Sequence, residues 1–264
     1  MPTVLSVMAH PDDAEFLCAG TLARLVNAHG WTAHIATMTP GDCGSADLDP
    51  EAISAIRREE GRAAASMIGA TYHCLEERDL RVFPNDRTLE KVIRLLRETR
   101  ADVVITHSPV DYMLDHESTS NITRAAAFGA PIRNMFLESA PPPPLDHIPT
   151  LYYADPIEGV GLFGEPVPVE FCIEISSVLD IKRQMLCAHA SQREWLLKHH
   201  GMDEYVAAME HWAAARGSLC NVSAAEGFRQ HRGHSYPQNN LLGKVLGALS
   251  PRGAEAAETR PGGA

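Results

Sequence analysis

The sequence lacks long apolar runs. Among its 264 residues there is no stretch of about 18 consecutive apolar side chains, the length that a membrane-spanning helix requires. The N-terminus also lacks a basic segment, and its first apolar run stops at His10, so it does not have the pattern of a secretory signal peptide. We therefore expect a cytoplasmic protein with no membrane span.

Paired cysteines and basic patches are missing as well. The six cysteines form no C-x-x-C pair, which argues against a disulfide framework and against a cysteine-rich zinc site. The formal net charge of -11 argues against nucleic acid and anionic membranes as partners, because both need a basic face. Histidine, by contrast, is plentiful at 13 residues, so each candidate ligand has to be argued from its position.

Strand-like and helix-like segments alternate in the first half of the chain. Apolar runs of strand length lie at 3–9, 32–38, 71–75 and 103–106, and helical patterns lie at 16–29, 50–68, 86–96 and 117–128. This order predicts βαβ units, and hence a Rossmann-like, mostly parallel sheet flanked by helices. A dinucleotide-binding oxidoreductase would share the pattern, but its Gly-x-Gly-x-x-Gly motif is absent after the first strand.

Regular patterns become weaker after residue 130. Strand-like runs lie at 151–154 and 169–175, and two helical patterns end near residues 189 and 216. We predict a single α/β domain over 1–248, made of the Rossmann-like core (1–130) and a C-terminal α+β elaboration (131–248). The tail at 249–264 has no periodicity, and we predict that it is disordered.

Polar side chains follow the first strand directly, in the run His10-Pro11-Asp12-Asp13. A strand-to-helix turn of this kind lies at the carboxyl ends of the strands, where open α/β sheets place their active sites. His10 and Asp13 offer a nitrogen and an oxygen ligand to a divalent metal, while Asp12 stays free to act as a general base. The alternative is ordinary helix capping, because aspartate also accepts hydrogen bonds from the first backbone N–H groups of a helix.

A second polar cluster, from His107 to His116, follows the fourth strand. Parallel strands have their carboxyl ends at one edge, so we expect this cluster beside His10 and Asp13. With His116 as the third ligand, the site has two imidazoles, one carboxylate and an open position, which is typical of catalytic zinc. We therefore predict Zn²⁺ as the cofactor, since Mg²⁺ prefers oxygen ligands. Arg57 and Tyr112 are the nearest candidates to stabilise an oxyanion.

Three stretches of this sequence resemble the PIG-L and LmbE-like zinc-dependent deacetylases. They are His10-Pro11-Asp12-Asp13, the helical segment from Arg57 to Ala70, and Asp115-His116. The resemblance implies an N-deacetylase, an amidohydrolase that removes an N-acyl group, with acetyl expected, from a small N-acetylated sugar such as N-acetylglucosamine or a related glycoconjugate. Relatives that cleave amide conjugates of thiols give the alternative substrate class.

The resemblance also assigns roles to individual residues. It makes His10, Asp13 and His116 the zinc ligands and Asp12 the base. Arg57 matches an arginine on the substrate side of the family pocket, and we expect Glu60 to hold it.

Two further residues are candidates for substrate contacts. Asp42 lies in a glycine-rich loop after the second strand, although the turn alone explains the glycines. His189 falls in the looser part of the resemblance, although a histidine at a helix end is also favoured by the helix dipole.

Met113 departs from the family pattern. Family members commonly carry a histidine at this position, where it helps to stabilise the oxyanion, and a thioether cannot donate a hydrogen bond. We expect Asp115, which loses this companion, to orient His116 instead. The candidate replacement donors are Tyr112, His107, His189 and His234.

The departure at Met113 leaves two hypotheses open. One is an enzyme with a rearranged donor and a different substrate, in which Tyr112 and Asp115 are catalytic with Asp12. The other is a weakened enzyme or a non-catalytic relative that binds zinc and a glycoconjugate. Hydrolases of this size often form symmetric homo-oligomers, but no sequence feature locates an interface.

Overall fold

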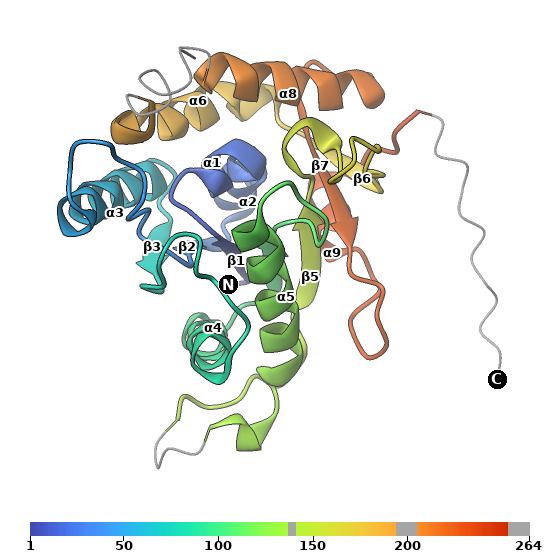
Figure 1. The fold of residues 1–264 in the computed structure, drawn as a ribbon. Helices are drawn as coiled ribbons and strands as arrows, with labels where there is room; N and C mark the ends of the chain where they lie inside the picture. Colours follow the sequence, from blue (N-terminus) through green and yellow to red (C-terminus); the bar gives the residue numbers. More distant parts are fainter. Residues whose placement is uncertain (137–140, 194–204, 253–264) are drawn as a thin grey trace, which may run out of the picture.

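A seven-stranded sheet forms the centre of the protein, with the strand order β3-β2-β1-β4-β5-β7-β6 (Figure 1). The computed structural model describes residues 1–136, 141–193 and 205–252. The strands are β1 (Thr3–Met8), β2 (Thr32–Thr37), β3 (Thr71–Cys74), β4 (Val103–Thr106), β5 (Thr150–Ala154), β6 (Phe171–Glu174) and β7 (Ala225–Gln230). Strands β1 to β5 pair in parallel, whereas β7 is antiparallel to β5 and β6. The predicted Rossmann-like, mostly parallel α/β sheet is confirmed.

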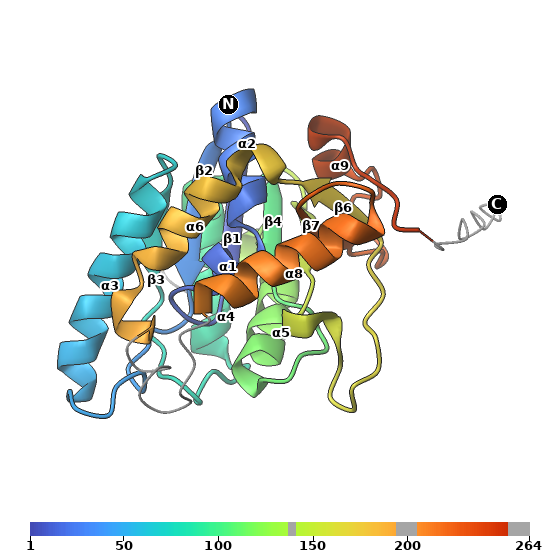
Figure 2. The same ribbon diagram turned by 90° about the horizontal axis from the view of Figure 1, so that it is seen from above.

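Helices cover both faces of the sheet. One face carries α1 (Asp13–Leu17), α2 (Ala19–His29), α3 (Pro50–Ser66), α6 (Leu179–Cys187), α8 (Tyr205–Leu219) and α9 (Leu241–Leu246). The other carries α4 (Asp86–Thr99) and α5 (Leu114–Gly129). Figure 2 shows α6 and α8 crossing the face that also carries α1 and α2.

Strand β1 shows why two helical layers are needed. All of its residues are buried, and Val4 and Met8 belong to one apolar core while Leu5 and Val7 belong to the other. Successive side chains of a strand point to opposite faces, so an apolar strand of this kind is stable only when both faces are covered.

The topology places a crevice beside the end of β1. Strands β2 and β4 lie on opposite sides of β1. The strand order therefore reverses at β1, and the loops after β1 and β4 lead to opposite sides of a crevice there. Ligands of open α/β sheets bind at this switch point, outside the carboxyl ends of the strands. The loops that follow β1 and β4 therefore meet at the expected position of the site.

The helix predicted at 16–29 is in fact two helices, broken at Cys18. The break frees the backbone N–H groups at the start of α2, and the Glu226 carboxylate accepts two of them, from Gly20 at 2.9 Å and from Thr21 at 2.7 Å. A carboxylate at a helix N-terminus satisfies these donors and is favoured by the helix dipole. The acceptor comes from β7, so no local pattern could reveal the break.

The sequence patterns missed β7 and α9. These two elements join the C-terminal part to the same sheet, because β7 connects β5 with β6. The backbone of Leu249 also pairs with Cys172, and Arg252 donates to the Leu219 carbonyl. The chain is thus hydrogen-bonded beyond residue 249, and residues 253–264 of the predicted tail lie outside the described residues. None of the described helices is long and apolar enough to cross a membrane.

A pair of histidines on β2 and β3 predicts a pH dependence of stability. Nδ1 of His34 lies 2.9 Å from Nε2 of His73, and burial lowers the pKa of both rings, with His73 adding to the effect on His34. The unfolded chain takes up protons below about pH 6.5 while the folded pair resists them. Stability contributed by the neutral pair is therefore present above that pH and lost as the pH falls through it.

Replacement of His73 by Gln should reduce this acid sensitivity. The drop in melting temperature between about pH 7.5 and about pH 5.5 should be smaller in His73→Gln than in the wild type. His211→Gln, at an exposed position of α8, is the matched control and should leave the drop unchanged. Equal drops in the wild type and His73→Gln would show that the pair does not set the pH dependence.

Candidate active site

A cavity of about 790 Å³ opens at the carboxyl ends of β1 and β4, a size suited to a small organic ligand. Its floor is polar and contains the motif residues after β1 together with His116, and much of its wall is apolar. The lining residues are His10, Asp12, Asp13, Phe16, Cys43, Gly44, Arg57, Asp79, Leu80, Tyr112, Met113, His116, Ile157, Glu158, Gln192, Tyr205 and Ala208.

The three predicted zinc ligands meet at the floor of this cavity. One ligand atom from each of His10, Asp13 and His116 lies within 4.8 Å of the other two, and all three residues are buried. Nδ1 of His10 lies 3.4 Å from Oδ2 of Asp13, and Nε2 of His116 lies 3.5 Å from Oδ1. The motif after β1 and the loop after β4 thus converge on one small polar centre.

Each ligand has a partner that fixes its orientation. Nε2 of His10 contacts Asp115 at 3.2 Å, and Nδ1 of His116 contacts Asp111 at 2.9 Å. Oδ2 of Asp13 accepts a hydrogen bond from the His10 backbone N–H at 2.8 Å and lies 3.1 Å from Nε2 of His107. Carboxylate partners of this kind orient metal-binding histidines and raise their basicity.

The electrostatics of the cluster favour a cation. Burial opposes the charged form, but hydrogen bonds with Asp115 and Asp13 raise the pKa of His10 to about 10. The pKa of His116 is also raised, because Asp13 and Asp111 outweigh its burial. The pKa of Asp13 lies well below its usual range, since His116 and His107 outweigh the effect of burial. Two imidazoles and a carboxylate with carboxylate partners are a donor set that fits Zn²⁺.

Asp12 lines the same cavity, and its side-chain partners lie outside the cluster of predicted ligands. The hydroxyl of Tyr205 donates to its Oδ2, and Nη2 of Arg57 lies 3.6 Å from the same oxygen. Burial raises the pKa of Asp12, although Arg57 lowers it in part. Asp12 also has a φ of 99°, a rare conformation for a residue with a side chain, and such strain is concentrated at functional sites.

Arg57 contacts the loops after β1 and β2. Its Nη2 donates to the Pro11 carbonyl at 2.7 Å. A Cβ atom placed on Gly41 or on Gly44 would lie 2.5 Å from its Nη1, so a side chain at either position would displace the guanidinium, and Gly41 also has a φ of 78° that favours glycine. The loop after β2 therefore packs closely against Arg57, and Gly44 itself lines the cavity.

Two predicted pairings are wrong. Asp115 contacts His10 and not His116, and it also accepts the backbone N–H of Leu80 at 2.6 Å, which holds the loop after β3 against the site. The carboxylate on His116 belongs to Asp111. Glu60 does not hold Arg57 either, since it accepts hydrogen bonds from the backbone N–H and the hydroxyl of Ser191.

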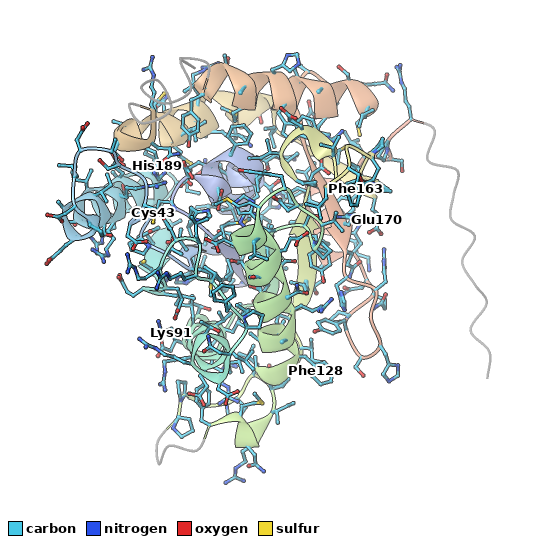
Figure 3. All side chains as sticks on the ribbon, viewed as in Figure 1. Cys43, Lys91, Phe128, Phe163, Glu170 and His189 are labelled. Atoms are coloured by element: carbon cyan, nitrogen blue, oxygen red, sulfur yellow. The ribbon has the colours of Figure 1, made fainter. Side chains whose placement is uncertain are left out.

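Asp42 and His189 lie outside the cavity lining. Oδ1 of Asp42 accepts the backbone N–H of Asp79 at 2.7 Å, and its Oδ2 accepts from Arg78. His189 is buried, with Nε2 3.5 Å from Glu15. Figure 3 shows His189 near the end of α6 beside α1, and Cys43 on the loop after β2. Asp42 and His189 therefore contact neighbouring segments of the chain. Cys43, next to Asp42, and Gln192, three residues after His189, line the cavity.

Tyr112 is the one predicted replacement donor that lines the cavity among the described residues. The residue is 61% exposed, and its ring packs edge-on against His116 with 5.4 Å between centroids. His107 is fully buried behind the ligands, where it stacks on His116. His234 is exposed and lies outside the lining. Sequence reasoning missed Tyr205, which follows a segment with no catalytic motif.

Comparisons with known proteins identify a similar family and similar folds. The model of the PIG-L family, described as GlcNAc-PI de-N-acetylase, matches residues 5–127. A conserved protein from Thermus thermophilus is 28% identical and has a TM-score of 0.70 over 87% of this chain and 94% of its own.

Two solved enzymes share the fold at lower identity. The N,N'-diacetylchitobiose deacetylase from Pyrococcus horikoshii is 20% identical with a TM-score of 0.73, over 90% of this chain and 88% of its own. The 4-carboxy-2-hydroxymuconate hydratase from Pseudomonas putida is 20% identical with a TM-score of 0.71, over 90% of this chain and 99% of its own. The family match includes the whole motif after β1, Arg57, and the loop from Asp111 to His116. Residues 5–127 of this chain therefore match the PIG-L family model, and the solved relatives share the fold of the wider chain.

Proposed function

We propose that the protein is a zinc-dependent amidohydrolase that removes an N-acyl group, with acetyl expected, from an amino sugar or a related glycoconjugate. One observation carries this proposal. The donor set of His10, Asp13 and His116 lies beside a further carboxylate, Asp12, whose partners are Arg57 and Tyr205 and not the ligands. A carboxylate beside a metal but not on it is suited to accept a proton from an attacking water.

The residues divide the chemistry between them. His10, Asp13 and His116 would hold the zinc ion, which as a Lewis acid polarises a carbonyl and makes water a better nucleophile near neutral pH. Asp12 takes a proton as the water oxygen bonds to the carbonyl carbon, and it passes that proton to the amine nitrogen as the C–N bond breaks. The products are a carboxylic acid and a primary amine.

Tyr112 is placed to serve the oxyanion that forms during this reaction. It lines the cavity next to His116. Although the residue as a whole is 61% exposed, partial desolvation in the cavity together with the nearby Asp13 and Asp111 raises its pKa, so its hydroxyl keeps its proton at neutral pH. A protonated hydroxyl is a hydrogen-bond donor, which the Met113 thioether cannot be. The departure at Met113 is thus compatible with an active enzyme.

The charge of the cavity separates amide hydrolysis from hydration of a polycarboxylate, the reaction for which the Pseudomonas enzyme is named. Apart from the predicted histidine ligands, Arg57 is the basic residue of the described lining, and it is already bonded to the Pro11 carbonyl and close to Asp12. Asp79 and Glu158 add negative charge to the same cavity. With Zn²⁺ on the predicted ligands, the carboxylates of the lining (Asp12, Asp13, Asp79 and Glu158) still exceed the positive charges of zinc and Arg57 by one, which disfavours a dianionic substrate relative to a neutral amide.

The deciding experiment is amine release from a panel of substrates. The purified protein is incubated with N-acetylated sugars, N-acetylated glycolipids and amide conjugates of thiols, first with a chelator and then with zinc restored. We expect zinc-dependent release of a primary amine from at least one amide and no hydration of an unsaturated dicarboxylate. Stoichiometric zinc without amine release from the whole panel would favour the non-catalytic binding hypothesis.

Replacement of His116 by Ala should lower the zinc content. The variant removes one of three protein ligands. Mutation of a residue that only hydrogen-bonds to a ligand already lowers metal affinity by about 10- to 100-fold, so loss of a ligand should lower it at least as much. Zinc per protein after dialysis against a weak chelator is the measurement, with His211→Ala on α8 as the control. Full zinc content in His116→Ala would remove this residue from the ligand set.

A further inference from the structure

Tyr205 reaches the catalytic floor from the C-terminal part of the chain. It is the first residue of α8, and its hydroxyl donates to Oδ2 of Asp12 at 2.5 Å, a contact between residues 193 positions apart. Tyr205 also lines the cavity. It lies beyond residues 5–127, so the matched domain alone does not provide this donor.

The two carboxylate oxygens of Asp12 differ in their contacts. Tyr205 and Arg57 both approach Oδ2. In the described ranges of the chain no hydrogen bond or ion pair involves Oδ1, and Asp12 lines the cavity. The carboxylate is therefore fixed through one oxygen, which leaves the other for a proton from the reacting water.

Helix α8 does not depend on this hydrogen bond for its position. Met209 and Ala213 are buried in the main apolar core. Arg216, near the far end of the helix, forms an ion pair with Asp155. The Tyr205 ring also packs near Phe16, with 6.3 Å between centroids. Removal of the hydroxyl alone should therefore leave the helix and the ring in place.

We propose that Tyr205 is a positioning residue that aligns the base Asp12 for proton transfer. The proposal rests on the amidohydrolase function, and it assigns to α8 a role in the reaction as well as in covering the sheet. A charged hydrogen bond of this kind restricts the carboxylate to one orientation, and misplacement of a base lowers the rate of the chemical step more than substrate binding.

Tyr205→Phe tests the proposal with an amide found in the panel. We expect kcat to fall about 10- to 100-fold while KM and zinc content stay within about threefold of the wild type. In an Asp12→Asn background, where no base remains to be aligned, the same change should have little further effect. Tyr236→Phe is the matched control, because that buried hydroxyl donates to the Arg124 carbonyl outside the cavity and should affect only stability.

A crystal structure of zinc-loaded Tyr205→Phe supplies a readout that does not need turnover. We expect the Asp12 carboxylate to have one orientation in the wild type, and in the variant either a different orientation or two alternative ones. If the wild type hydrolyses no amide, the proposed function fails and this structural comparison alone decides the role of Tyr205. An unchanged kcat, an equal loss in the Asp12→Asn background, or an unmoved Asp12 carboxylate would overturn the proposal.

Discussion

Asp12→Asn should leave zinc content at the wild-type level and reduce kcat about 100- to 10,000-fold, the range that general base catalysis contributes. The amide oxygen of Asn can still accept the hydrogen bond from Tyr205, but it cannot take a proton at neutral pH. Asn also tolerates a positive φ better than most residues, which matters at a φ of 99°. The variant therefore changes the chemistry at this position with little change in the fold.

The measurement combines kcat with metal analysis on the same preparation. Glu158→Gln is the control, because Glu158 is an exposed carboxylate at the rim of the same cavity, and its loss should alter kcat by no more than a fewfold. Retained turnover in Asp12→Asn would remove this residue as the base. A parallel loss of zinc would instead make Asp12 a ligand and would require a new assignment of the cluster.

The position of the site could be predicted because its signals are local. His10, Asp12 and Asp13 follow a strand whose side chains are all buried, and the order of strands and helices predicts which edge of the sheet they occupy. The loop before His116 follows a neighbouring parallel strand. Local sequence and a general rule of sheet topology are then sufficient to bring the ligands together.

The partners of the ligands could not be predicted because they depend on where a helix begins. The sequence pattern predicts a helix start at residue 117, whereas α5 begins at Leu114. Residues 114–116 are therefore helical, and because successive helical side chains point about 100° apart, Asp115 and His116 face different directions. Asp115 consequently lies in the first turn against His10, and Asp111, still in the loop, contacts His116.

Tyr205 and β7 were missed for a related reason. The hydrogen bond from Tyr205 to Asp12 joins residues 193 positions apart, and no pattern around Tyr205 reveals its partner. Strand β7 contains Glu226, and a glutamate is expected at an exposed position from the sequence alone. It is buried because Lys182 of α6 lies against it. Contacts between elements far apart in the sequence therefore determine both the position of Tyr205 at Asp12 and the burial of Glu226 in β7.

The buried ion pair between Lys182 and Glu226 predicts a large stability effect. Both side chains are almost fully buried, and Lys182 also donates to the Phe16 carbonyl of α1 at 2.8 Å. Glu226 in turn accepts the backbone N–H groups of Gly20 and Thr21. The pair thus joins α1, α2, α6 and β7 beneath the segment that follows the motif from His10 to Asp13.

Glu226→Gln should lower the free energy of unfolding by about 3–5 kcal/mol, because it leaves the Lys182 ammonium buried without a counter-charge. Urea unfolding should show a lower midpoint with an unchanged slope. Arg62→Ala, which breaks the exposed pair with Glu59, is the control and should cost less than about 1 kcal/mol. The double variant Lys182→Met with Glu226→Gln should recover part of the loss, since no charge then remains buried. A midpoint for Glu226→Gln equal to that of Arg62→Ala would show that solvent reaches the pair.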